Sequence, residues 1–289
     1  MRVLVTGRSG FTGRYLSQAL TAAGHEVLPF DAEITDPIAV NNSVRQQLPD
    51  SVVHLAAKAF VYSDDISSFY SINQLGAFNL LDAISRYIPG APVLIASSAN
   101  VYGNMTGGLL TEESPTNPAN HYAVSKLSME LGARLWTDRL PITIARPFNY
   151  TGRDQEQKYV ISKIVDHFRR RAPTIELGNI DVFRDFGDVR SVVAAYVGLL
   201  EGHHTGTFNV CTGCAFSLSE IIELCVKLTN HRPTIEVNKT FVRPNDIQVL
   251  VGSPSKLNSA LPSWRPIPLE ATLDWMLSDV MGWTTSTPA

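Results

Sequence analysis

The sequence is poor in cysteine, in charge of one sign and in long hydrophobic runs. It contains three cysteines, Cys211, Cys214 and Cys225, which are too few for a disulfide framework and favour a reducing compartment. A net charge of -3 provides no basic surface for nucleic acid. No apolar run approaches the roughly 18 residues of a membrane span. We therefore expect a cytoplasmic protein without nucleic-acid or membrane partners.

The hydrophobic content, in contrast, is sufficient for a large core. Hydrophobic residues make up 44% of the 289 positions, and this length fits one large domain or two modest ones. Residues 2–5 already have the pattern of a strand, so we expect no signal peptide at the start of the sequence.

Short apolar runs alternate with longer helical patterns in the first half of the chain. Strands are predicted at 3–5, 26–30, 52–55, 93–96 and 142–145, and helices at 14–23, 37–48, 68–87 and 121–139. Strands without polar alternation are buried on both faces, and helices between them favour parallel pairing. The sequence therefore predicts an α/β fold with a doubly wound parallel sheet.

A glycine-rich turn follows the first predicted strand and opens the first helix. It contains Gly7, Arg8, Gly10, Phe11 and Gly13. Glycines allow the backbone to turn tightly and approach a pyrophosphate, while the helix N-terminus supplies free amide donors. The spacing is GxxGxxG rather than the commoner GxGxxG, but its place between a strand and a helix is that of a dinucleotide-binding turn. We predict a Rossmann-type domain that binds NAD(P)H through these five residues.

The choice between NADH and NADPH stays open. Asp31 stands at the end of the second predicted strand, where an acid would bind the ribose hydroxyls of NAD, and Asp36 follows shortly after. Arg8, inside the glycine turn, could instead contact the 2′-phosphate of NADP.

Three further residues form a candidate catalytic set for carbonyl reduction. Tyr122 and Lys126 lie four residues apart, on one face of a predicted helix, and Ser98 ends a predicted strand. A tyrosine with the usual pKa of about 10 releases its proton reluctantly, and a neighbouring ammonium lowers that pKa. We predict that Tyr122 is the proton donor, that Lys126 tunes it and binds the nicotinamide ribose, and that Ser98 orients the carbonyl oxygen of the substrate.

Motifs spread over most of the chain resemble those of the extended short-chain dehydrogenases/reductases that act on nucleotide sugars. They are residues 6–13, 54–57, 97–98, 101–103, 122–126, 146–149 and 184–186. Segments 120–127, 145–149, 178–186 and 208–213 are similar, within that family, to the GDP-6-deoxy-4-keto-mannose reductases, which form GDP-rhamnose. The resemblance implies an NAD(P)H-dependent reductase of a 4-keto-6-deoxy sugar nucleotide.

The same resemblance implies further site residues and a domain division. Ala56 and Ala57 would contact the cofactor, while Asn149, Arg184 and Arg243 would bind the substrate together with Ser98. Arginine suits a diphosphate because its donors form a planar fork. Prolines gather after Pro147, as expected for a smaller C-terminal substrate-binding lobe. We expect residues 1–149, with 189–212, to form the Rossmann domain and residues 150–188 and 213–285 to form this lobe.

Alternative activities differ in how well they fit the sequence. Dehydratases of this superfamily place acids after the catalytic hydroxyl residue, where this chain has Ala99 and Asn100, so dehydration is not expected. A nucleotide-sugar 4-epimerase uses the same Ser98, Tyr122 and Lys126 set and stays open. A cofactor-sensing regulatory protein would not need that set.

No metal site is expected. Cys211 and Cys214 form a CxxC without the second ligand pair that structural zinc requires.

The resemblance also implies a homodimer, in which the helices predicted at 68–87 and 121–139 pair across a twofold axis. These helices carry apolar residues beyond one buried face: Phe69, Tyr70, Phe78, Leu127, Leu131, Leu135 and Trp136.

Overall fold

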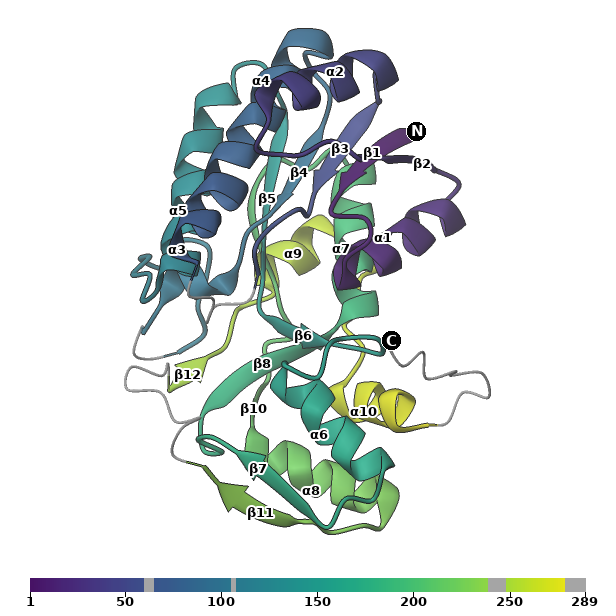
Figure 1. Cartoon of the computed structure of the whole chain (residues 1–289), viewed down its shortest axis with the longest axis vertical. Coiled ribbons are helices and arrows are strands. Elements are labelled where there is room, and N and C mark those ends of the chain that lie inside the picture. The colour runs from purple at the N-terminus through teal and green to yellow at the C-terminus, as the bar shows by residue number, and fades with distance from the viewer. Residues whose placement is uncertain (60–64, 105–107, 239–247, 279–289) are drawn as a thin grey trace.

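The computed structural model describes residues 1–59, 65–104, 108–238 and 248–278. Its largest element is a six-stranded parallel sheet in the order β2-β1-β3-β4-β5-β9 (Figure 1). The strands are β1 (Arg2–Thr6), β2 (Glu26–Pro29), β3 (Ser51–His54), β4 (Val93–Ala96), β5 (Ile142–Pro147) and β9 (Gly206–Val210). The apolar runs that predicted the first five strands lie at the centre of the molecule because both faces of the sheet are covered.

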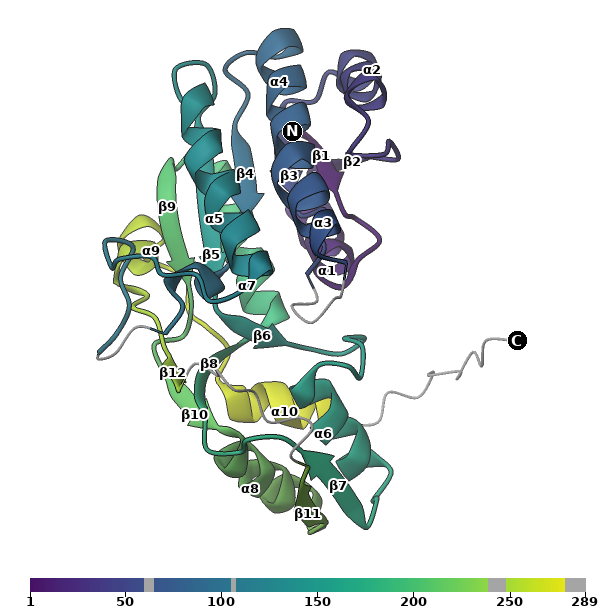
Figure 2. The same ribbon diagram turned by 60° about the vertical axis from the view of Figure 1, so that its left-hand side comes forward.

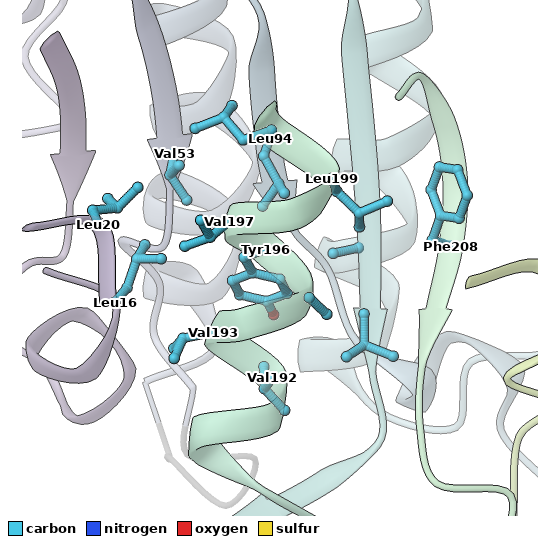
Figure 3. Packing of buried hydrophobic residues seen from close by; sticks show 14 of the residues in the cluster. Leu16, Leu20, Val53, Leu94, Val192, Val193, Tyr196, Val197, Leu199 and Phe208 are labelled. Carbon is cyan, nitrogen blue, oxygen red and sulfur yellow. The ribbon is translucent and has the colours of Figure 1, made fainter. Parts of the chain in front are cut away.

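Helices cover the two faces of this sheet. One face holds α1 (Phe11–Ala22) and α7 (Val189–Glu201), while the other holds α2 (Pro37–Gln47), α4 (Ala77–Tyr87) and α5 (His121–Ala133). Figure 3 shows Val193, Tyr196 and Val197 of α7 facing Leu16 and Leu20 of α1 under the strands. The prediction of a doubly wound, Rossmann-type parallel sheet is confirmed.

Most of the remaining elements form a smaller lobe beyond the carboxyl ends of the strands (Figure 1). Strands β6 (Asn149–Thr151), β10 (Ala215–Ser217) and β12 (Val249–Leu250) all pair with β8 (Phe183–Asp188). A second pair joins β7 (Thr174–Leu177) to β11 (Thr234–Val237). Helices α6 (Val160–Arg169), α8 (Leu218–Thr229) and α10 (Leu269–Leu277) share one apolar core with these strands, and α9 (Ser255–Ala260) lies against β9.

The helix expected at 68–87 has three parts. A turn, α3 (Ile66–Ser68), leads into a π-helical segment, Phe69–Gly76, and α4 follows. The wide turn holds the buried Asn73, whose side-chain amide donates to Ser125 (3.0 Å) and to the carbonyl oxygen of Lys58 (3.2 Å) and accepts from the backbone N–H of Lys58 (2.8 Å). These long-range hydrogen bonds fix the wider turn, which short-range sequence patterns do not report.

The helix expected at 121–139 is shorter than predicted. It begins where the Asn120 side chain accepts a hydrogen bond from the Ala123 N–H (2.8 Å), as an N-cap residue does. It ends at Ala133, and a tighter 3-10 turn, Arg134–Trp136, continues the chain. The apolar pattern continues past this change because both helix types keep side chains near every third position on one face.

Helices α4 and α5 pack against each other on the same face of the sheet (Figure 2). A Cβ atom added to Gly132 of α5 would overlap the ring of Phe78 on α4. This glycine is therefore required by the contact between the helices, not by its backbone conformation.

We predict that Gly132→Ala destabilises the fold by about 1–3 kcal/mol, because the added methyl group overpacks this contact. Urea unfolding should show a lower midpoint than the wild type. The double variant Gly132→Ala/Phe78→Leu should recover part of the loss, since the smaller side chain makes room. A Gly132→Ala protein as stable as the wild type would contradict the close contact, because alanine otherwise favours helices by about 1 kcal/mol over glycine.

Candidate active site

Most of the predicted site residues that the structure describes lie where the carboxyl ends of the parallel strands face the smaller lobe. This is where open α/β sheets bind their ligands. The glycine turn joins β1 to α1, and Gly7 adopts φ +69°. A Cβ on Gly7 would lie 2.8 Å from the backbone N of Ala56, and one on Gly13 would overlap the carbonyl oxygens of Gly7 and Arg8. Only glycine fits both positions, so the chain preserves a close backbone cradle of the kind that suits a dinucleotide pyrophosphate.

A buried threonine and histidine support this cradle from below. The Thr6 hydroxyl accepts hydrogen bonds from the backbone N–H groups of Leu55 and Ala56, both at 3.1 Å. Its own proton must therefore go to Nδ1 of His54, 2.8 Å away. His54 is consequently protonated on Nε2, which has no hydrogen-bond partner among the described residues. Burial, followed by the positive charge of Lys126, lowers the pKa of His54 to about 3.

Ser98, Tyr122 and Lys126 are brought together and buried. Their exposed fractions are 6%, 8% and 3%. Ser98 follows β4, while Tyr122 and Lys126 lie in the first two turns of α5. The Lys126 ammonium donates to the carbonyl oxygen of Ala96 (2.8 Å), two residues before Ser98. The three predicted catalytic side chains therefore lie close together at the carboxyl end of β4.

The electrostatics of this set suit a proton donor that is activated only when needed. Burial raises the pKa of Tyr122, and a hydrogen bond with the Ser98 side chain opposes that rise. Burial lowers the pKa of Lys126 to about 8, while the charge of Glu130 raises it. Tyr122 is therefore a neutral phenol near pH 7, and Lys126 is predominantly an ammonium.

The residues that follow Ser98 support its position without adding an acid. The Ser98 hydroxyl accepts from the backbone N–H (3.2 Å) and the side-chain amide (3.1 Å) of Asn100. It thereby caps a short 3-10 turn, Ala99–Tyr102, that the sequence did not predict. Neither Ala99 nor Asn100 can exchange a proton at neutral pH.

Two of the predicted substrate residues lie in strands of the smaller lobe. Asn149 begins β6, which pairs with β8 at Phe186, and Arg184 lies in β8. The Arg184 guanidinium donates to the carbonyl oxygens of Phe183 (2.9 Å) and Gln248 (3.4 Å). Arg243 lies outside the described residues. The roles of these three residues in binding a substrate stay predictions.

The residues predicted to choose the cofactor differ in their surroundings. Arg8 in the glycine turn and Asp31 after β2 are both exposed. Asp36 is the N-cap residue of α2 and accepts from the backbone N–H groups of Ile38 (2.9 Å) and Ala39 (3.2 Å). Its predicted cofactor contact would have to coexist with this capping role.

Sequence reasoning missed a buried network behind the site. Glu130 and Arg146 form an ion pair of 2.6 Å with side chains 1% and 4% exposed, and Arg146 also donates to the Tyr102 hydroxyl (2.9 Å). A signal was present, since Glu130 follows Lys126 by four residues on the same helix face. Sequence reasoning also missed Tyr150. Its hydroxyl lies 2.7 Å from the Thr12 hydroxyl, in the first turn of α1.

Metal-ligand clusters and membrane-spanning helices are both absent from the described part of the chain. It contains no cluster of three or more His, Cys, Asp or Glu side chains that could hold a metal ion. Cys211 and Cys225 are buried, Cys214 is exposed, and all three are unpaired thiols. None of the described helices combines the length and apolarity needed to cross a bilayer.

The fold and the geometry of the site are those of an extended short-chain dehydrogenase/reductase. The family model for GDP-mannose 4,6 dehydratase matches residues 30–274. The chain is 35% identical to GDP-6-deoxy-D-talose 4-dehydrogenase of Aggregatibacter actinomycetemcomitans, covering 90% of this chain and 91% of that protein. It is 34% identical to GDP-6-deoxy-D-mannose reductase of Pseudomonas aeruginosa, covering 96% of both. The protein therefore belongs to this family of nucleotide-sugar-modifying enzymes.

Solved structures agree with this assignment. The structure of RMD from Pseudomonas aeruginosa complexed with NADPH has a TM-score of 0.87 at 33% identity, with 96% of both chains covered. A Burkholderia cenocepacia protein described as a candidate epimerase has a TM-score of 0.89 at 43% identity, with the same coverage.

We predict that His54 makes the folded protein sensitive to acid. The unfolded histidine takes up a proton below about pH 6.5, whereas the folded one stays neutral down to about pH 3. Between these two pH values the unfolded state binds more protons than the folded state. The free energy of unfolding therefore decreases as the pH is lowered, by about 1.4 kcal/mol per pH unit. Urea unfolding at pH 7 and pH 5 should show a smaller pH dependence for His54→Gln than for the wild type. Equal pH dependence would show that His54 is already charged in the folded protein.

Proposed function

We propose that this protein is a reductase that uses NAD(P)H to reduce the 4-keto group of a nucleotide-linked 4-keto-6-deoxy sugar. The reaction that we favour converts GDP-4-keto-6-deoxy-D-mannose to GDP-D-rhamnose. The observation that carries this proposal is the buried set of Ser98, Tyr122 and Lys126 at the strand ends beside the glycine cradle. The two relatives named above, a GDP-6-deoxy-D-talose dehydrogenase and a GDP-6-deoxy-D-mannose reductase, support this substrate class.

The three residues divide the chemistry of carbonyl reduction between them. The nicotinamide, when bound, supplies the hydride for C4 of the sugar. Tyr122 gives its proton to the alkoxide that develops at O4, and the Lys126 ammonium stabilises the phenolate that remains. Ser98 holds the carbonyl oxygen by a hydrogen bond and thereby orients it. Because burial raises the pKa of Tyr122, the phenol keeps its proton until the alkoxide forms.

We assign the two lobes different ligands. Residues 1–149 with 189–212 would bind the cofactor, and residues 150–188 with 213–285 would bind the nucleotide sugar. The cofactor residues in this proposal are Gly7, Arg8, Gly10, Phe11, Gly13, Asp31, Asp36, Ala56, Ala57, Tyr122 and Lys126. The substrate residues are Ser98, Asn149, Arg184 and Arg243. The unpaired thiols support a cytoplasmic location, where nicotinamide cofactors and reduced cysteines coexist.

A 4-epimerase is the second candidate, favoured by the likeness to the Burkholderia cenocepacia protein. The deciding experiment incubates the protein with NADPH or NADH and a panel of 4-keto sugar nucleotides, and separately with NAD⁺ and the corresponding 4-hydroxy sugar nucleotides. A reductase consumes the nicotinamide in proportion to product, whereas an epimerase isomerises its substrate without net consumption. Product analysis also reports the face of C4 that receives hydride, since 6-deoxytalose and 6-deoxymannose differ only at that carbon.

We predict that Tyr122→Phe reduces kcat by about 10²–10⁴-fold while leaving cofactor affinity intact, because the ring packs but cannot supply the proton. Steady-state turnover and NAD(P)H titration measure the two effects separately. Tyr87→Phe, at the end of α4, is the matched control and should retain full turnover. Turnover above about a tenth of the wild type in Tyr122→Phe would exclude this tyrosine as the acid.

We also propose that the protein is a homodimer formed through α4 and α5. The outward faces of the π-helical segment, α5 and the turn after α5 carry exposed apolar side chains, notably Leu75 (54% exposed), Leu131 (53%) and Leu135 (80%). Phe69, in contrast, is 1% exposed and packs edge-on against Tyr122 inside the subunit. A twofold contact that covers the exposed side chains would remove them from water, and such isologous contacts are the commonest in soluble oligomers.

We predict that Leu131→Glu and Leu135→Glu shift the protein from dimer to monomer at micromolar concentration, because each places a charge in the contact. Light scattering measures the mass, and turnover should fall with the dimer because α5 carries Tyr122 and Lys126. Val237→Glu replaces another exposed apolar residue (55% exposed) in the smaller lobe and should leave the mass unchanged. A wild-type protein that is monomeric and fully active would refute the proposal.

A further inference from the structure

A buried polar network lies directly behind the candidate catalytic residues. Arg146 donates through Nη2 to Glu130 Oε2 (2.6 Å) and through Nε to both carboxylate oxygens (3.0 and 3.2 Å). Both side chains are almost completely buried. A buried ion pair of this kind persists only where the surrounding groups satisfy its hydrogen bonds, so its partners indicate what it holds in place.

The carboxylate end of the network holds α5 against the end of β4. Ser97, the neighbour of Ser98, donates its hydroxyl to Glu130. One helical turn earlier, the Lys126 ammonium donates to the carbonyl oxygen of Ala96 (2.8 Å). Two adjacent turns of α5 are therefore hydrogen-bonded to Ala96 and Ser97, the two residues that precede Ser98.

The guanidinium end of the network holds the short turn that follows Ser98. Arg146 donates to the Tyr102 hydroxyl (2.9 Å), which in turn donates to Oδ1 of Asn209 in β9 (2.7 Å). Tyr102 ends the short turn that Ser98 caps, and the Arg146 guanidinium lies 4.9 Å from the centre of its ring. Ser98 thus stands between two segments that the same ion pair anchors.

We propose that Glu130 and Arg146 are positioning residues for the reaction, which hold Lys126 and Ser98 at a fixed separation around Tyr122. This inference rests on the reductase function proposed above and names residues that do not touch the substrate. A misplacement of about 1 Å in such a set costs on the order of 10²-fold in rate. The network therefore acts on turnover rather than on substrate affinity.

Glu130 has a second effect because it is the negative charge that faces Lys126. Burial lowers the pKa of Lys126 to about 8, and the charge of Glu130 opposes this. His54, beneath Lys126, contributes no positive charge near neutral pH. Tyr122 is a neutral phenol, and Arg146 is not among the groups that shift the pKa of Lys126. Without Glu130 the ammonium form loses its support, and Lys126 should deprotonate at lower pH.

The test uses the full-length enzyme with a saturating nicotinamide cofactor and Glu130→Gln. We expect kcat to fall on the order of 10²-fold while KM for the sugar nucleotide changes little. The alkaline limb of the pH profile of kcat should move to lower pH, because the reaction needs a charged Lys126. A purely structural role would lower the melting temperature and leave this limb in place.

Two further variants separate positioning from folding. Glu130→Gln/Arg146→Gln removes both charges, so thermal stability should recover relative to the single variant while the alkaline limb stays shifted. Asp188→Asn, which breaks the buried contacts of Asp188 with Arg190 and Thr272, is the matched control. It should lower stability without moving the limb.

Ser97→Ala provides a milder variant should Glu130→Gln not fold. It keeps every charge and removes only one donor, so we expect a severalfold loss of kcat with an unshifted alkaline limb. The proposal is overturned if the wild type is active, Glu130→Gln and Ser97→Ala both keep its kcat, and Glu130→Gln keeps its pH profile. A wild type that reduces no 4-keto sugar nucleotide would instead refute the reductase function itself.

Discussion

The buried ion pair between Glu130 and Arg146 is the constraint on which the geometry of the site depends. Removing two charges from water is costly, and their attraction offsets this only when every donor and acceptor is satisfied. Here the Ser97 and Tyr102 hydroxyls complete the arrangement, so displacement of any neighbouring segment would leave a buried charge unpaired. The cost of such displacement makes one arrangement of α5, β4 and β5 far more favourable than its alternatives.

This constraint allows the chain to bury a lysine next to a tyrosine. Each of Lys126 and Tyr122 would be destabilised by burial in its charged form, and both pKa shifts show that penalty. A site that depends on an ammonium must therefore carry a compensating carboxylate nearby, and Glu130 provides it one helical turn away. The same helix thus carries the proposed acid, the charge that would tune it and the charge that stabilises the tuning residue.

The sequence predicted the elements whose signals are local. The run Val3, Leu4 and Val5 and the glycine turn identified the first strand and helix, and the four-residue spacing from Tyr122 to Lys126 placed both on one helix face. The buried network could not be predicted in this way, because Tyr102 and Asn209 meet across 107 residues. The short strands of the smaller lobe were missed for a related reason, since β10 and β12 depend on pairing with β8 rather than on their own patterns.

The acid–base set and the fold do not by themselves choose between reduction and epimerisation. Both reactions move a hydride at C4 and a proton at O4, so both would use the proposed set of Ser98, Tyr122 and Lys126 in the same way. They differ in what happens after the first hydride transfer, because an epimerase must turn the keto sugar over before hydride returns. The difference between a reductase and an epimerase would therefore lie in how the smaller lobe binds the nucleotide and how readily the cofactor dissociates. Dehydration would need an acid or base beside the hydroxyl residue, and Ala99 and Asn100 offer neither.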